Sequence, residues 1–443
     1  MTPTQKVADF VVNTDFSSFP TEAVRIGKRL ILDCLGVALA AKSDPVVVKL
    51  IKILKAQGGK KETRVWGQSF SLPLANAVQI NATMGHALDF DDSAFSHPTS
   101  TILPVVVGLG EYLQLSGSDV LGGLLIAYEV FGSISLSSNQ DLLRNKGWHP
   151  TPVLGTISVA ATAAKLMRLD EAGVRMAMGI AGSCTSGLGQ NFGTMTKPLH
   201  VGFSARNGLM AAQMAREGII ADGHILEAER GYGAVFFGKD GHDFGKIDQI
   251  LGPPYKVITP GVNIKPWPCC RGAHRSIEVA LSLQKKIAIR EEEVESIECD
   301  LHLDGPTLHH YPGTGLEAKF SIAYCVSVAL LKGRVVIEDF TDQSVSDPVV
   351  QRLMKKVIHL RRPGAEEVIT LNLKGGRSFS GGVEFVKGDA KKNPFSDEDL
   401  TEKFKTCVKE VLPGRRASEA IQQISKLERA PNFREFMEQI LGS

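Results

Sequence analysis

The chain has 443 residues, of which 43% are hydrophobic and 22% are charged, as expected of a globular protein with a large buried core. Fifty basic and 48 acidic residues leave a formal net charge of +2. This charge provides no field to attract nucleic acid or a membrane surface, so we expect neither as a partner. The length predicts two domains, or one large domain with an insertion.

Residues 1–15 lack a basic segment followed by an apolar core, so no secretory signal is predicted. Two apolar stretches, 30–41 and 120–136, are interrupted by Asp33 and Glu129 and are not predicted to span a membrane. The seven cysteines are odd in number and show no C-x-x-C spacing, which favours buried thiols over disulfides or a zinc site. We therefore expect a cytoplasmic protein.

Residues 21 to about 250 show apolar side chains at three- and four-residue spacing, as in 153–166 and 209–217. Frequent alanine and glycine would let such helices approach closely. This part of the chain is predicted to be an all-helical bundle.

After Pro254 the pattern changes, because alternating apolar residues and a Gly375-Gly376 turn indicate strands interleaved with helices. The predicted strands are 294–303, 369–373 and 379–386, and the predicted helices are 275–287 and 320–331.

Ser396, followed three residues later by Asp399, resembles a capping box and predicts a closing helix. The predicted fold is therefore mainly α. A large all-helical domain, residues 1–267 plus 394–443, carries an inserted smaller α+β lid domain, residues 268–393.

The densest polar cluster in an apolar region is HALDFDDSAFSHP, residues 86–98. If its first part is helical, His86, Asp89 and Ser93 share one face and Asp91 points elsewhere. A carboxylate beside a histidine fixes its tautomer and raises its basicity, as proton transfer requires. A solvated helix end with a capping Asp explains the segment equally well.

Asp89, Asp91 and Asp92 also form D-x-D-D, the acid motif of protonation-initiated terpene cyclases. A content of 7% aromatic residues does not indicate the aromatic walls that carbocations need. Clustered carboxylates bind Mg²⁺ as well, but no neighbouring motif marks a phosphate-bearing substrate. Walker A, H-E-x-x-H and G-x-S-x-G motifs are absent from the sequence. We predict no metal and no cofactor.

Basic residues stand directly before proline at several places. Proline favours the first helical position, so the preceding residue is expected at the N-cap, beside free backbone N–H groups. A cation there is unfavourable unless an anion is bound, which points to a carboxylate pocket. The number of such pairs is close to chance, so their context carries the argument. The pairs considered are His97-Pro98, His149-Pro150, Lys197-Pro198 and Lys265-Pro266.

Two further segments bear on a ligand site. Residues 187–193 lack the spacing of a nucleotide loop and are interpreted as a flexible connection that lets Thr196 and Lys197 approach a ligand. The sequence KPWPCCRGAH, residues 265–274, concentrates a lysine, an arginine and a histidine at the predicted domain boundary, where clefts form.

Four segments in order resemble the signature segments of the MmgE/PrpD family: GHALDFDDS (85–93), WHPT (148–151), GTMTKPLH (193–200) and KPWPCCRGAH (265–274). The similarity covers nearly the whole chain. That family includes 2-methylcitrate dehydratase, cis-aconitate decarboxylase and iminodisuccinate epimerase. The resemblance implies a large helical domain, a smaller α+β lid and a homodimer.

The resemblance also implies which residues form the pocket. Ser93 replaces the usual threonine and keeps the hydroxyl, whereas Cys270 falls where the cis-aconitate decarboxylases carry a histidine, which disfavours decarboxylation. The implied pocket residues are Asp89, Ser93, His97, His149, Lys197, Lys265, His274 and Tyr324.

We assign roles within this pocket as hypotheses. His97 is the proton carrier, because an unperturbed pKa of about 6.5 suits transfer in both directions. Asp89 and Ser93 orient groups and substrate, and Tyr324 is either a second proton donor or a core tyrosine. The remaining residues bind substrate: Lys197, Lys265 and Arg271 neutralise its carboxylates, and His149 and His274 contact it.

The chemistry that the resemblance implies is proton transfer at carbon next to a carboxylate in a small di- or tricarboxylic acid. We expect a cofactor-independent lyase that dehydrates a citrate or 2-methylcitrate type acid or, second, decarboxylates a cis-aconitate type acid. An isomerase that epimerises an iminodisuccinate-like dicarboxylate is the alternative, because the same side chains could serve both. A non-catalytic scaffold or binding protein is disfavoured, because a decayed site is free to lose costly buried charges.

Overall fold

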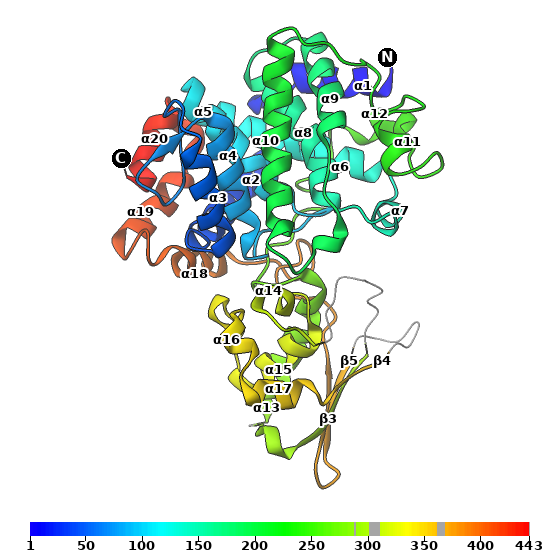
Figure 1. The fold of residues 1–443 in the computed structure, drawn as a ribbon, viewed down its shortest axis with the longest axis vertical. Helices are drawn as coiled ribbons and strands as arrows, with labels where there is room; N and C mark the ends of the chain where they lie inside the picture. Colours follow the sequence, from blue (N-terminus) through cyan, green and yellow to red (C-terminus); the bar gives the residue numbers. More distant parts are fainter. Residues whose placement is uncertain (288, 301–310, 361–367, 443) are drawn as a thin grey trace.

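The structure is a computed structural model that describes residues 1–287, 289–300, 311–360 and 368–442. Helices dominate it, as Figure 1 shows, and the predicted mainly α fold is confirmed. A larger helical body lies in the upper part of the view, and a smaller body that contains the main sheet lies below it.

The larger body combines helices from the first part of the chain with the C-terminal helices α18 to α20. A short antiparallel pair, β1 (Thr63–Arg64) and β2 (Ser71–Leu72), lies between α3 and α4 in the chain. The helices are α1 (Pro3–Asn13), α2 (Thr21–Ala40), α3 (Pro45–Ala56), α4 (Leu74–Ala87), α5 (Pro98–Leu113), α6 (Gly117–Leu136), α7 (Gln140–Asn145), α8 (Pro150–Leu166), α9 (Glu171–Cys184), α10 (Thr196–Arg216), α11 (Tyr232–Phe236), α12 (Ile247–Ile250), α18 (Asp397–Val408), α19 (Arg415–Ile424) and α20 (Phe433–Leu441).

Helix α4 is a central helix, because nearly all of its residues are buried and no face of it is exposed. Helix α10 packs against α4, α8 and α9. At the α4–α10 contact, a Cβ on Gly202 would lie 2.3 Å from Thr83 Oγ1 and 2.8 Å from Gln79 O. The expectation that small residues let these helices approach closely is confirmed here.

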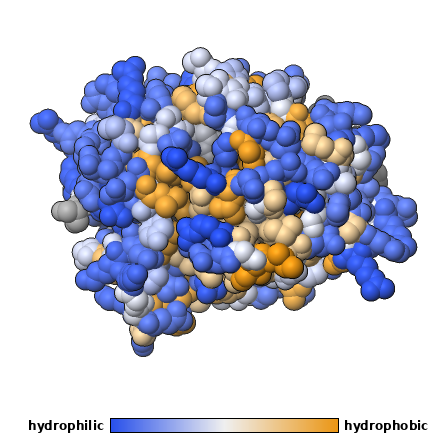
Figure 2. Space-filling view, turned by 90° about the horizontal axis from the view of Figure 1, so that it is seen from above, coloured by the Kyte–Doolittle hydropathy of each residue, from blue (hydrophilic) through white to orange (hydrophobic). Residues whose placement is uncertain are grey.

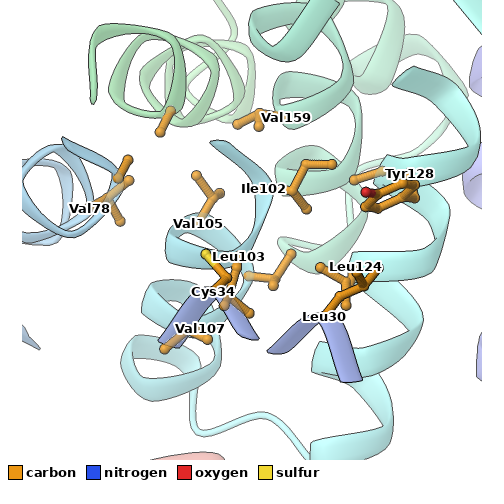
Figure 3. Close-up of a cluster of buried hydrophobic side chains, with 14 of the residues drawn as sticks. Leu30, Cys34, Val78, Ile102, Leu103, Val105, Val107, Leu124, Tyr128 and Val159 are labelled. Atoms are coloured by element: carbon orange, nitrogen blue, oxygen red, sulfur yellow. The ribbon is translucent and has the colours of Figure 1, made fainter. Parts of the chain in front are cut away.

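Figure 3 shows the core that these helices share: Leu30 from α2, Val78 from α4, Ile102 from α5, Leu124 from α6 and Val159 from α8 meet in one cluster. Among the described helices, α6 is the one long and apolar enough to cross a membrane, and 89% of its apolar window is buried inside the protein. Its environment is that of a core helix.

The smaller body contains a four-stranded sheet in the order β4-β3-β5-β6. Strand β3 runs parallel to β4, with Ile297 opposite Val357, and antiparallel to β5, while β5 and β6 form a hairpin. The elements are β3 (Val294–Asp300), β4 (Val357–Leu360), β5 (Val368–Leu373), β6 (Ser378–Gly382), α13 (His274–Lys286), α14 (Gly315–Ala318), α15 (Ile322–Lys332), α16 (Asp342–Val345) and α17 (Pro348–Met354).

The predicted elements of this region largely agree with the structure. Ile369, Leu371 and Leu373 are buried along β5, and Gly375 and Gly376 form the turn with φ of +86° and +84°. The predicted strand 379–386 is too long, because β6 ends at Gly382 and the chain then turns back towards the larger body. Residues 301–303 of the predicted strand 294–303 lie outside the described residues.

The chain crosses between the two bodies at residues 264–268 and again at 387–397. The two crossings are hydrogen-bonded, because Ile264 N donates to Gly388 O over 3.1 Å. Buried apolar residues form one cluster in each body, and the cluster of the smaller body extends from Cys269 to Leu373. The division at residues 268 and 393 stays a prediction. Ser396 and Asp399 form the predicted capping box of α18.

Candidate active site

The polar cluster after α4 is a loop. Helix α4 ends at Ala87, and Asp89 has a φ of +51°, a left-handed conformation that Asp tolerates better than most residues. The predicted helical face of His86, Asp89 and Ser93 is therefore wrong. Asp91 does not point elsewhere either, since each of its carboxylate oxygens lies 3.0 Å from His86 Nδ1.

Lysines from three distant parts of the chain hold the end of α4 and this loop. The last carbonyl groups of a helix have no partner within the helix, and here ammonium groups supply some of the missing donors. The pairs are Lys319 with Ala87 O, Lys265 with Asp89 O and Lys403 with Phe90 O, each over 2.9 Å.

The Asp89 carboxylate is shared by two lysines. It accepts from Lys197 Nζ over 2.5 Å and from Lys265 Nζ, and all three side chains are buried. Burial opposes the charge of Asp89, but the two ammonium groups outweigh burial and hold the pKa of Asp89 well below its usual range. Lys197 Nζ also lies 5.5 Å and 5.0 Å from the ring centroids of Phe192 and Phe320.

Four histidines form a continuous row beside this group, in the order His97, His86, His149, His200. Their successive ring centroids lie 4.7, 6.0 and 5.4 Å apart. Burial lowers the pKa of every member, to about 3 for His97 and to about 4 for His200. The assumption of a pKa near 6.5 for His97 is thus wrong, and the row is neutral near pH 7.

One proton lies between the last two members of the row. His149 Nδ1 and His200 Nδ1 are 3.2 Å apart, so one nitrogen donates and the other accepts. The backbone N–H of His149 donates to Gly187 O over 3.0 Å. Residues 187–193, which we interpreted as a flexible connection, are therefore bonded to the segment that carries His149.

The pKa values of two adjacent carboxyl groups in the loop are shifted in opposite directions. Although burial opposes its charge, the neighbouring His86 and His97 rings keep the pKa of Asp91 far below its usual range. Burial raises the pKa of Asp92 to about 7, and its Oδ2 accepts from Tyr128 over 2.5 Å. His97 Nδ1 lies 3.0 Å from Asp92 O and 3.5 Å from Asp91 Oδ2, so this pair fixes the His97 ring.

The expectation that the basic residue before each proline is a helix N-cap is correct for two of the four pairs. His97 and His149 are the N-cap residues of α5 and α8, although neither side chain makes a capping hydrogen bond. Lys197 lies inside the first turn of α10, and Lys265 precedes a segment without a helix. Asp89 supplies the anion that their burial requires.

Several buried polar atoms around these groups have no protein partner among the residues that the structure describes. Such atoms cost free energy unless water or a ligand satisfies them. They are His86 Nε2, Asp92 Oδ1, Ser93 Oγ and His274 Nδ1.

Ser93 and His274 reach this region from opposite sides of the junction. Ser93 pairs through its backbone with Asn263, over 2.8 Å and 3.0 Å, just before the chain crosses to the smaller body. His274 Nε2 contacts Cys269 O over 3.2 Å, and burial together with nearby Lys265 holds the pKa of His274 well below its usual value.

Two predicted site residues have other partners. Arg271 Nη1 donates to Lys387 O over 3.4 Å, at the returning crossing. Tyr324 is fully buried in the core of the smaller body, where its hydroxyl donates to Asp339 O. Its ring also contacts Phe340 within the same core, and this placement favours the core tyrosine of the two alternatives.

His86, Asp91 and His97 could also hold a metal ion, because one ligand atom from each lies within 4.8 Å of the others. Two imidazoles and one carboxylate are a common donor set for divalent metals. Lys197 and Lys265 place two positive charges in the same buried cluster, which opposes a further cation. We retain the prediction that no metal is needed.

Sequence reasoning omitted several members of this site. His86 and Asp91 stand in the polar cluster, and His200 lies one turn after Lys197, a spacing that could have identified it. Lys319 and Lys403 carry no local signal, because only the fold brings them to the loop.

Comparisons with known proteins show which family the chain belongs to. Residues 5–245 match the model of the MmgE/PrpD N-terminal domain, and residues 267–429 match that of the MmgE/PrpD C-terminal domain. A cis-aconitate decarboxylase from Mus musculus is 29% identical over 91% of this chain and 86% of its own length. A 2-methylcitrate dehydratase from Salmonella typhimurium is 23% identical over 93% of this chain and 90% of its own length. The chain therefore belongs to the MmgE/PrpD family.

Proposed function

We propose that this protein is a lyase that transfers a proton at carbon next to a carboxylate in a small tricarboxylic acid, with loss of water or carbon dioxide. The observation that carries the proposal is one buried carboxylate, Asp89, shared by Lys197 and Lys265 beside a row of neutral histidines. Relatives named for both kinds of lyase activity support it.

The proposed chemistry uses the lysines for charge and the imidazoles for protons. A substrate carboxylate competes with Asp89 for Lys197 and Lys265, and the same ammonium groups stabilise the enolate-like charge of the intermediate. His97, neutral near pH 7, accepts the proton that leaves carbon. No step in this scheme requires a cofactor.

Dehydration and decarboxylation are supported by different observations. Cys270, at the junction between the bodies, stands where the family resemblance places a histidine in the decarboxylases, which favours dehydration. The cis-aconitate decarboxylase from Mus musculus matches with a higher identity than the 2-methylcitrate dehydratase from Salmonella typhimurium, 29% against 23%, which favours decarboxylation. Epimerisation of an iminodisuccinate-like dicarboxylate remains the alternative, because the row offers more than one base.

One experiment separates these reactions. The pure protein is incubated in deuterated water with citrate, 2-methylcitrate, cis-aconitate and iminodisuccinate in turn, and the products are followed by NMR. We expect elimination of water or loss of carbon dioxide from a tricarboxylate. Deuterium exchange with inversion of iminodisuccinate would support the epimerase instead, and no reaction with any acid would contradict the proposed function.

We also propose that the protein acts in the cytoplasm as a homodimer. Figure 2 shows the end of the larger body that lies away from the smaller one, where apolar side chains gather among polar ones. Ile219 and Ile220, which follow α10, are 51% and 84% exposed. Exposed apolar surface of this kind is typical of protein contacts.

A further inference from the structure

We infer that His86 is a second catalytic acid–base residue, oriented by Asp91 and paired with His97. This inference rests on the proposed function and deepens it, because it supplies the partner that His97 needs for an elimination. It is carried by the geometry of the histidine row.

The first observation is that a buried ring nitrogen of His86 has no hydrogen-bond partner among the described residues. His86 is 1% exposed and lies in the last turn of α4, yet its Nε2 has no hydrogen-bond partner among the described residues. Leaving such a nitrogen unsatisfied costs about 1–3 kcal/mol. Ser93 Oγ and Asp92 Oδ1, in the loop that follows, also lack a partner among the described residues.

The second observation is the support behind the ring. Both oxygens of Asp91 lie 3.0 Å from His86 Nδ1, and this carboxylate is fully buried. A buried carboxylate on one ring nitrogen fixes the tautomer and leaves the other nitrogen free to accept a proton. A histidine that serves only to pack the core needs neither a buried carboxylate on one ring nitrogen nor a second nitrogen without a partner.

The third observation is that one carboxylate serves two rings. Asp91 Oδ2 lies 3.0 Å from His86 Nδ1 and 3.5 Å from His97 Nδ1, and the ring centroids are 4.7 Å apart. Asp91 stabilises one imidazolium in the pair, whereas a second would bring two cations together beside Lys197 and Lys265. The free pair is neutral near pH 7, and it takes up a single extra proton when the negative carboxylates of a substrate bind beside it.

A pair with one proton suits dehydration. The C–H bond next to the carboxylate breaks, its proton moves to the neutral imidazole, and its electron pair forms the new C=C bond. The C–O bond on the neighbouring carbon breaks, and the hydroxyl leaves as water with the proton of the other imidazole. One ring gains the proton that the other loses, so the pair again holds one extra proton, which passes back through water to the other ring before the next turnover.

Decarboxylation would use a single ring. The C–C bond breaks, carbon dioxide leaves, and the electron pair that remains on carbon takes a proton from the imidazolium, which then regains one from water. The charged and titratable groups around His86 in either reaction are Asp89, Asp91 and His97 from the loop, His149 at the start of α8, and Lys197 and His200 from α10.

The test compares His86→Gln, His86→Ala and Asp91→Asn with wild type on the acid that wild type converts. We expect each variant to lose on the order of 10² to 10⁴ in kcat. His242→Gln is the matched control, because His242 also has an Nδ1 contact, 2.9 Å from Gly238 O, but stands outside the row. Its kcat should stay within about twofold of wild type.

Chemical rescue separates a catalytic ring from a structural one. Added imidazole should raise the rate of His86→Ala at least about tenfold, whereas pyrazole, of similar shape but much weaker basicity, should not. Near-normal kcat in His86→Gln, or equal rescue by pyrazole, would overturn the inference. If His86 variants do not fold, near-normal kcat in Asp91→Asn overturns it. Wild-type inactivity on every acid would instead reject the proposed function itself.

Discussion

His97 is the residue whose removal should affect the chemical step most directly. Its ring is fixed by Asp92 O and Asp91, and its side chain makes no capping bond to α5. Asn is a good N-cap, so His97→Asn should not destabilise the helix. We predict a loss of kcat on the order of 10² to 10⁴ with KM within a few-fold, measured by steady-state kinetics and a thermal melt. A near-normal kcat would move the proton-transfer role to His86, Lys197 or His149.

Asp92 should make the free energy of unfolding depend on pH. Burial raises its pKa to about 7, above the value of about 3.9 in an unfolded chain. The folded protein therefore binds this proton more tightly, and the resulting stabilisation is complete below about pH 4 and is lost as the pH rises through about 7.

Asn cannot ionise, so the free energy of unfolding of Asp92→Asn should not fall in this way as the pH rises. We predict that the free energy of unfolding of the variant minus that of wild type increases by roughly 4 kcal/mol between about pH 4 and about pH 8. Urea unfolding at the two pH values measures it. A difference that does not change with pH would show that folding does not raise the pKa of Asp92.

At the scale of elements, helix α18 stabilises the loop after α4 through Lys403. Lys403 Nζ lies 2.6 Å from the buried Asp33 and 2.9 Å from Phe90 O. Removing one partner of a buried pair leaves an uncompensated charge, so Lys403→Met should cost about 3–5 kcal/mol of unfolding free energy and lower activity. Urea unfolding measures the first effect.

Two further variants show whether the pair is the cause. Lys405→Met alters an exposed lysine of the same helix and should be nearly silent. The double variant Asp33→Asn/Lys403→Met should recover part of the stability, because no unpaired charge remains. Equal losses in Lys403→Met and Lys405→Met would contradict the role of the pair.

The elements that sequence could predict are those whose pattern is local. Apolar spacing located α8 and α13, alternation located β5, and a Ser-Asp pair located the cap of α18. The conformation of the loop after α4 could not be predicted from local sequence. The left-handed conformation of Asp89 and the hydrogen bonds of the loop carbonyl groups depend on lysines far away in the chain. Most of the predicted site residues lie near that loop, with Arg271 and Tyr324 as the exceptions.

At the scale of the molecule, the charge balance of the site predicts metal independence. Lys197 and Lys265 already neutralise Asp89, and a divalent ion at His86, Asp91 and His97 would add to their positive charge. We predict full turnover after exhaustive chelation. Loss of activity that magnesium restores would identify the acidic loop as a metal site.

The proposed homodimer gives a second prediction at this scale. Light scattering on a size-exclusion column should give twice the 47.8 kDa of one chain. The mass should persist on dilution if the apolar end of the larger body is buried between two copies. A mass of one chain at every concentration would reject the dimer.

The lysines that bind the carbonyl groups of the loop also determine at which stage of protein synthesis the loop can form. Lys403 is synthesised 313 residues after Phe90, whose carbonyl it binds. At typical rates of translation, roughly 15–60 s separate the two on the ribosome. Contacts between such distant positions form late, because closing a long loop has a large entropic cost. A nascent chain can therefore build much of its bundle before Lys403 can bind the carbonyl group of Phe90, and release of the C-terminal helices is the step that completes the loop.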